Sequence, residues 1–254
     1  MRGCGRGAVT GQNTRLEPRG EAVGMTSDTP GVPRAAYATI GAGRSVDPPS
    51  ARIGRAFASD GPNGIAAHPL LREIVSRVRP LGGAVHLIGA VTPSGIAGNQ
   101  HYMAVLAALL SHEGVKVWVH AVMDGQDTRP QGGIDHLSEF LDDIAGAEHA
   151  DLGSVLGRAY GFDDGCDPAA TATAWRALAN AEAPYTEYPT AYLDECYRKG
   201  LDDDRVMPAL ASSFRGIRQD DALLLVNLQP DHGQSLLAAL SDPLAAGLAQ
   251  KSPV

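Results

Sequence analysis

The stretch Lys116–Pro130, KVWVHAVMDGQDTRP, constrains the fold more than any other part of the chain. It starts within Val115–Val122, a short apolar run rich in β-branched residues, which is typical of a strand buried on both faces. The run breaks at Asp124-Gly125 into a polar loop. A buried strand that ends in such a loop and is followed by a helical segment predicts an α/β sheet that binds ligands beyond the carboxyl ends of its strands.

The same pattern of strand, polar loop and helix recurs along the chain. Apolar runs predict further strands at 84–91, 152–156 and 222–228. Apolar residues at helical spacing predict helices from His68-Pro69 to about Pro80, and at about 100–112, 137–144, 168–182, 189–199 and 232–240. We therefore expect an α/β fold, with a parallel or mixed sheet covered by helices on both faces. The loops DGQDT, GRAYGFDD and NLQPDH would then meet at one edge of that sheet.

Composition divides the chain into three segments. Residues 1–35 are rich in Gly, Arg, Thr and Pro without periodicity and are predicted to be a disordered leader, within which Met25 is an alternative start. Residues 36–64 are predicted to be a linker-like segment, and their IGAGR turn (40–44) is interpreted as a connector. Residues 65–254 are expected to form a single α/β domain.

Charge and cysteine content exclude several classes of protein. A net charge of -8 argues against nucleic acid or an anionic membrane as partner. No apolar run approaches the roughly 18 residues of a membrane span, and no apolar segment follows the N-terminal arginines as in a secretory signal. Cys4, Cys166 and Cys196 are widely spaced and form no CxxC motif. This suits a reducing cytoplasm and predicts no cysteine-ligated metal site. We expect a cytoplasmic protein without a cofactor.

Four segments between residues 38 and 240, together with IGAGR, resemble the cofactor-independent phosphoglycerate mutases in order and spacing. They are HLIGAVTPSG, VHAVMDGQDTRP, LGRAYGFDD and VNLQPDH. The resemblance implies the fold of the family's transferase domain, which grips phosphoglycerate. The family's other domain resembles alkaline phosphatase and carries two divalent metals and a serine nucleophile.

The chain departs from the family pattern at the positions that carry its chemistry. Pro33 stands where the family has its serine, and the metal-binding segments have no counterpart. Family arginines correspond to Gln126, Asp164, Gln229 and His232, and family histidines correspond to Ala97 and Asn99. The positions that keep the family residue are Asp124, Asp127, Arg158, Asn227 and Asp231. The resemblance thus implies a shortened, degenerate homologue without the metal domain, which is not an active phosphoglycerate mutase on its own.

Loss of cations predicts a change of ligand. Several lost charge-assisted contacts, each contributing roughly 1.5–3 kcal/mol, would remove affinity for a phosphorylated acid. We interpret the domain as repurposed, as a metal-free acid–base enzyme (isomerase, cyclase, lyase or hydrolase) acting on a small polar metabolite in specialised bacterial biosynthesis. Its candidate catalytic residues are Asp127, His232 and Asp124. Its candidate substrate-binding residues are Gln126, Arg158, Gln229, Asn99, His101, Arg129, Asp163 and Asp231.

Other interpretations stay open at this point. The substitutions also fit evolutionary drift, and the chain could be a non-catalytic binding or regulatory subunit that pairs with a separate phosphatase-type chain or forms a homodimer. Residual phosphotransfer in such a complex is a third hypothesis. Asp124 could merely form a turn, and Arg158 could merely form an ion pair with Asp163 or Asp127. His86 and His120 are expected to be hydrogen-bonded histidines of the core or of a strand edge, and the acidic run 202–204 is expected in a solvated loop.

Overall fold

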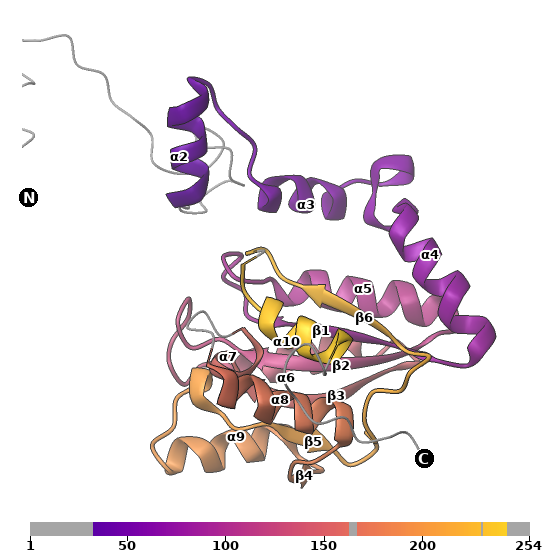
Figure 1. Cartoon of the computed structure of the whole chain (residues 1–254), viewed down its shortest axis with the longest axis vertical. Helices are drawn as coiled ribbons and strands as arrows, with labels where there is room; N and C mark the ends of the chain where they lie inside the picture. The colour runs from indigo at the N-terminus through magenta and orange to yellow at the C-terminus, as the bar shows by residue number, and fades with distance from the viewer. Residues whose placement is uncertain (1–32, 163–166, 230, 243–254) are drawn as a thin grey trace, which may run out of the picture. The chain divides into compact units, whose positions relative to one another are not determined.

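The structure, a computed structural model, describes residues 33–162, 167–229 and 231–242 (Figure 1). The chain divides into two compact units, Met1–Ala58 and Ser59–Val254. No helix of the described part is long and apolar enough to cross a lipid bilayer.

The described part of the first unit contains two helices, α2 (Pro33–Ala42) and α3 (Pro49–Ala58). The predicted leader lies outside the described residues apart from 33–35, which begin α2. The IGAGR segment, predicted to be a connecting turn, begins inside the end of α2, and Gly43 follows that helix with a left-handed φ of 63°. Glycine adopts this conformation without steric cost, so it suits the end of a helix.

The second unit alternates strands and helices. Its strands are β1 (Ala84–Val91), β2 (Lys116–Met123), β3 (Ala150–Gly157), β4 (Tyr185–Thr186), β5 (Ala209–Ala211) and β6 (Ala222–Val226). Its α-helices are α4 (Pro69–Val78), α5 (Gln100–His112), α6 (Gly133–Ile144), α7 (Arg158–Gly161), α8 (Pro168–Asn180), α9 (Pro189–Arg198) and α10 (Gln234–Ser241). Short 3-10 turns are η2 (Gly61–Asn63), η3 (Ile65–Ala67), η4 (Arg79–Leu81) and η5 (Asp203–Arg205). All four strands that periodicity predicted are present.

The strands form one mixed sheet in the order β4-β5-β3-β2-β1-β6. Strands β6, β1, β2 and β3 are parallel, as predicted. Strand β5 runs antiparallel to β3, and β4 pairs with β5 in parallel. These two strands were not predicted, because runs of two or three residues are too short to show an alternating pattern.

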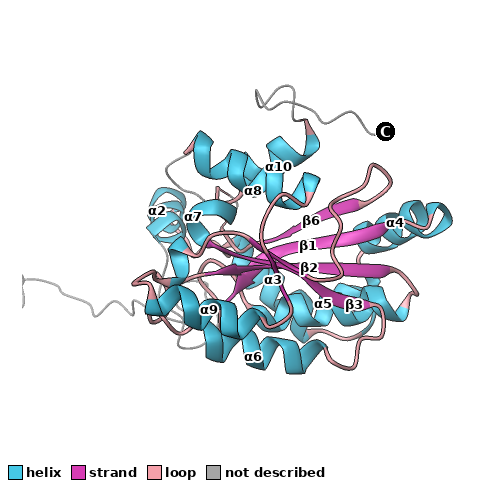
Figure 2. Ribbon diagram, turned by 90° about the horizontal axis from the view of Figure 1, so that it is seen from below, coloured by secondary structure: helices cyan, strands magenta, loops and turns pink. Residues whose placement is uncertain are grey.

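Helices cover both faces of the sheet (Figure 2). Helices α8 and α10 lie on one face, where Leu178 and Leu236 pack against Ile88, Val122 and Leu156 of the central strands. Helices α5 and α6 lie on the other face, with α9 beside α6. Because both faces are buried, β1 is buried along its whole length, which explains its continuous apolar sequence.

A chain of buried polar side chains crosses the sheet beneath Phe214. His86 Nε2 lies 3.0 Å from Asp221 Oδ2, His86 Nδ1 lies 2.9 Å from His120 Nε2, and His120 Nδ1 lies 2.8 Å from Ser154 Oγ. Both histidines are fully buried, which confirms that they are core residues. Because the ionised Asp221 only accepts hydrogen bonds, each neutral histidine must donate from Nε2 and accept at Nδ1.

This network makes the stability of the domain depend on pH. Burial, reinforced by the electrostatic repulsion between His86 and a protonated His120, lowers the pKa of His120 well below its ordinary value of 6.5. The unfolded chain therefore binds a proton at His120 that the folded protein does not bind. Stability from this residue is present above about pH 6.5 and is lost as the pH falls below it.

We predict that His120→Gln, which keeps polar atoms but cannot titrate, flattens this pH dependence. Between pH 7.5 and pH 5, the free energy of unfolding of the wild type should fall more steeply than that of the variant, by up to about 1.4 kcal/mol per pH unit. Urea denaturation followed by circular dichroism at several pH values measures both slopes. Parallel slopes for the two proteins would contradict this account of His120.

Candidate functional site

The register of the central strands places three polar residues in one row. The last residues of β1, β2 and β3 are partners across the sheet. Thr92, Asp124 and Arg158 directly follow these residues and therefore lie side by side at the carboxyl edge. This is the edge at which α/β sheets bind their ligands.

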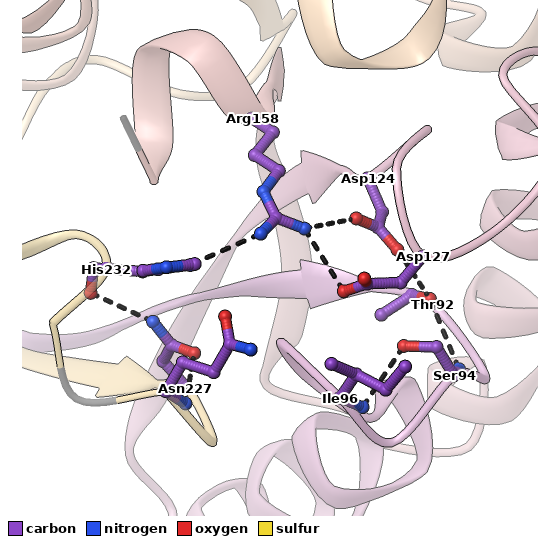
Figure 3. Close-up of polar contacts among 9 residues, drawn as sticks. Thr92, Ser94, Ile96, Asp124, Asp127, Arg158, Asn227 and His232 are labelled. Atoms are coloured by element: carbon purple, nitrogen blue, oxygen red, sulfur yellow. Dashed lines mark hydrogen bonds and ion pairs between the residues drawn. The ribbon is translucent and has the colours of Figure 1, made fainter. Parts of the chain in front are cut away.

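Arg158 is the centre of the side chains at this edge (Figure 3). Its Nη1 donates to Asp124 Oδ1 at 2.7 Å and to Asp127 Oδ2 at 3.2 Å, and its Nη2 faces His232 Nδ1 at 3.3 Å. Thr92 Oγ1 donates to the second oxygen of Asp124 at 3.1 Å. We call Thr92, Asp124, Asp127, Arg158 and His232 the strand-end cluster.

Burial decides how strongly these charges interact. The Arg158 side chain is 7% exposed and that of Asp124 is 1% exposed, whereas that of Asp127 is 19% exposed. Burial opposes the charge of Arg158, but hydrogen bonds and charges from Asp124 and then Asp127 raise its pKa above its ordinary value. Arg158 is therefore a permanent cation whose charge is balanced inside the protein.

The loop after β6 brings His232 to the cluster. Asn227 Nδ2 donates to the His232 carbonyl at 2.9 Å, and Asn227 Oδ1 accepts from the Gln229 amide at 2.9 Å. The Leu228 amide donates to the Ala97 carbonyl at 2.8 Å, which joins this loop to the loop after β1. Asn227 thus closes the loop on itself and holds His232 opposite Arg158 (Figure 3).

Hydrogen bonds within the loop after β1 hold Thr92 in place. Its Oγ1 accepts from the Ser94 amide at 3.2 Å, and Ser94 Oγ accepts from the Ile96 amide at 3.2 Å (Figure 3). Serine and threonine commonly form such short-range turns. Sequence reasoning did not single out Thr92, although its place after β1 matches that of Asp124 after β2.

The structure brings together Asp124, Asp127, Arg158 and His232, with Gln229 in the adjoining loop. It does not bring Arg129 to them, because that side chain is 76% exposed and pairs with Asp135. Asn99 caps α5 by accepting from the His101 amide, Gln126, His101 and Asp231 are exposed, and Asp163 lies outside the described residues.

Two polar atoms beside the cluster are buried without a hydrogen-bond partner among the described residues. They are Thr128 Oγ1, in the loop after β2, and Gln229 Oε1, in the loop after β6. A buried polar atom without a partner costs free energy, so both would gain from a ligand that hydrogen-bonds to them.

Among the residues that the structure describes, no three His, Cys, Asp or Glu side chains are arranged to hold a metal ion. The cluster therefore does not fit the divalent metals of the phosphatase-like domain, and we derive no step through a metal.

Fold and cluster together define an α/β domain with a group of hydrogen-bonded polar and charged side chains at the carboxyl edge of a mostly parallel sheet. The family model for the N-terminal part of 2,3-bisphosphoglycerate-independent phosphoglycerate mutases matches residues 62–253. The chain belongs to this family, which confirms the resemblance of its strand-end loops.

Individual relatives agree with the family assignment. The chain is 30% identical over 244 residues to the 2,3-bisphosphoglycerate-independent phosphoglycerate mutase of Rhodopseudomonas palustris, covering 96% of this chain and 47% of that enzyme. The corresponding enzyme of Gluconobacter oxydans is 30% identical over 235 residues, which cover 92% of this chain and 45% of that enzyme. The chain spans about half the length of the curated relatives it matches. The solved phosphoglycerate mutase of Leishmania mexicana shares the fold, with a TM-score of 0.77 at 21% identity over 89% of this chain and 44% of that one.

We predict that Asp124 stabilises the domain more than Asp127 does, although both bind Arg158. Asp124→Asn should lower the free energy of unfolding by about 3 kcal/mol, because it leaves a buried guanidinium without its shortest ion pair. Asp127→Asn should lower the free energy of unfolding by roughly 1 kcal/mol, since this carboxylate lies farther from Arg158 and is more exposed than that of Asp124. Urea denaturation at pH 7.5 measures both changes. Equal losses would show that burial does not separate the two roles.

Proposed function

We propose that the strand-end cluster binds a small polar molecule without a phosphate group and acts on it by acid–base chemistry. The observation that carries this proposal is the internal pairing of Arg158 with two carboxylates. Arg158 is the only arginine or lysine that takes part in the cluster's hydrogen bonds among the described residues. A phosphate at this guanidinium would compete with Asp124 and Asp127 and would be repelled by both.

A neutral or cationic ligand suits the same arrangement better. Asp127 and His232 are partly exposed, so a bound molecule can reach them. The unpartnered oxygens of Thr128 and Gln229 add further hydrogen-bonding positions. A molecule that donates several hydrogen bonds would therefore be recognised without a second cation from the protein.

The contact with Arg158 sets the proton position on His232. A guanidinium only donates, so Nδ1 of the neutral imidazole must accept and Nε2 must carry the proton. We assign the carboxylate of Asp127 as the general base and Nε2–H of His232 as the donor that stabilises negative charge developing on the substrate. Asp124 was predicted to be catalytic, but both of its oxygens are already bonded, so we assign it the role of holding Arg158. Isomerisation, cyclisation, elimination and hydrolysis all need only such a pair.

We predict that the ligand preference follows charge. In thermal-shift measurements, 3-phosphoglycerate should leave the melting temperature unchanged at millimolar concentration, because a ligand far below its Kd adds no stability. In a library of small polar compounds, those that stabilise the protein should be uncharged or cationic, and Asp127→Asn should weaken the cationic ones. Strong stabilisation by 3-phosphoglycerate would overturn the charge argument.

A compound that the protein converts should reveal the two catalytic groups. Asp127→Asn and His232→Ala should each lower kcat by about 100-fold or more, the usual contribution of a general base or of a hydrogen-bond donor to developing charge. Asp135→Asn and His112→Ala, which change exposed residues on α6 and α5, are matched controls and should keep the wild-type rate. Unchanged rates in both cluster variants would remove these residues from the mechanism.

A second candidate function is that of a binding or regulatory subunit. The length of the relatives supports it. They contain about as much sequence again as this chain matches. A phosphatase-type domain or chain is therefore a candidate partner, as is a second copy of this chain. Size-exclusion chromatography with light scattering distinguishes a monomer, a homodimer and a complex with another protein. It should be run on the purified protein and on any complex isolated from the source organism.

A further inference from the structure

The segment 202–206, which contains η5, packs against both loops that carry the buried ion pair. Gly125 follows Asp124, and a Cβ atom there would lie 2.9 Å from Asp203 Cβ. Gly157 precedes Arg158, and a Cβ atom there would lie 2.4 Å from the Asp204 carbonyl oxygen. Approaches this close are possible only where the loops have glycine. The segment therefore fits directly against the residues next to Asp124 and Arg158.

Hydrogen bonds join the same segment to both loops. The Asp203 amide donates to the Pro130 carbonyl at 2.7 Å, and Asp203 Oδ2 accepts from the Gly133 amide at 2.9 Å. The Gly157 amide donates to the Val206 carbonyl at 2.7 Å. The end of the DGQDTRP loop and the turn into Arg158 are thus held by one short piece of chain.

The carboxylate of Asp203 is the buried centre of these contacts. Asp203 is 1% exposed, so the prediction of a solvated acidic loop was wrong for this residue. Its second oxygen accepts from the hydroxyl of Tyr197 on α9. Burial raises the pKa of Asp203 above its ordinary value, although hydrogen bonds from Tyr197 and Gly133 oppose the rise. The ionised form therefore costs stability in the folded protein, so stability alone does not account for a carboxylate here.

We propose that Asp203 is a positioning residue of the strand-end cluster, which sets the distance between the Asp124–Asp127 loop and Arg158 through segment 202–206. The positioning itself is a property of the folded chain. Only its use in catalysis rests on the proposed function. Asp203 touches neither Arg158 nor His232 in the hydrogen bonds described above. It acts through Gly133 and Pro130 on one side, and through the Gly157–Val206 bond on the other.

The histidine side chain of the cluster reports this positioning without any ligand. In protein labelled with ¹⁵N-histidine, imidazole spectra report the tautomer and environment of His232 beside Arg158. Asp203→Ala removes both acceptor oxygens and leaves the Gly133 amide and the Tyr197 hydroxyl without their shared partner, so the His232 signals should shift or broaden. Tyr197→Phe removes a single hydrogen bond and should give a smaller shift in the same direction. Asp202→Ala, which removes a neighbouring exposed contact with Gln131, is the matched control and should leave the signals unchanged.

The outcomes separate this inference from the proposed function. His232 signals that stay at their wild-type positions in folded Asp203→Ala protein would overturn the positioning role. If that variant does not fold, Tyr197→Phe decides, and an unchanged His232 spectrum there overturns the role equally. Failure to find any converted compound would count against the acid–base enzyme and would leave the spectroscopic result standing.

Discussion

The buried ion pair between Arg158 and Asp124 is the interaction on which the site depends. It joins the ends of two adjacent parallel strands, where register alone places the two residues side by side. Neither charge can be removed singly without leaving the other buried and uncompensated. Thr92 extends the row to β1 through the second oxygen of Asp124, so three strand ends share one polar network.

This pairing also supports the ligand preference that we propose. A guanidinium that already binds two carboxylates is a structural cation more than a free anion receptor. In that proposal, the groups left for a ligand are the more exposed Asp127, the Nε2 edge of His232, and the oxygens of Thr128 and Gln229 that have no partner among the described residues. Family membership describes the scaffold, whereas the chemistry follows from the side chains at this edge.

The supporting structure is as specific as the cluster itself. Asn227 closes the loop that carries His232, and segment 202–206 packs against glycines that flank Asp124 and Arg158. On the α8 side of the sheet, the chain from Asp221 to Ser154 satisfies two fully buried histidines that have no part in the site. Buried polar groups of this kind must be fully bonded, so they restrict how the strands and loops can be arranged.

The sequence by itself determined the class of fold, the central strands and the family, because apolar periodicity and strand-end loops are local properties of the chain. It also identified Asp124, Asp127, Arg158 and His232, which the structure brings together. Only the tertiary structure decided that Arg129 turns outward to Asp135 and that Asp203, within an acidic run, is buried beneath the site. It alone revealed β4 and β5 as well. The physical reason is that these outcomes depend on contacts between segments far apart in the chain, which neither composition nor spacing encodes.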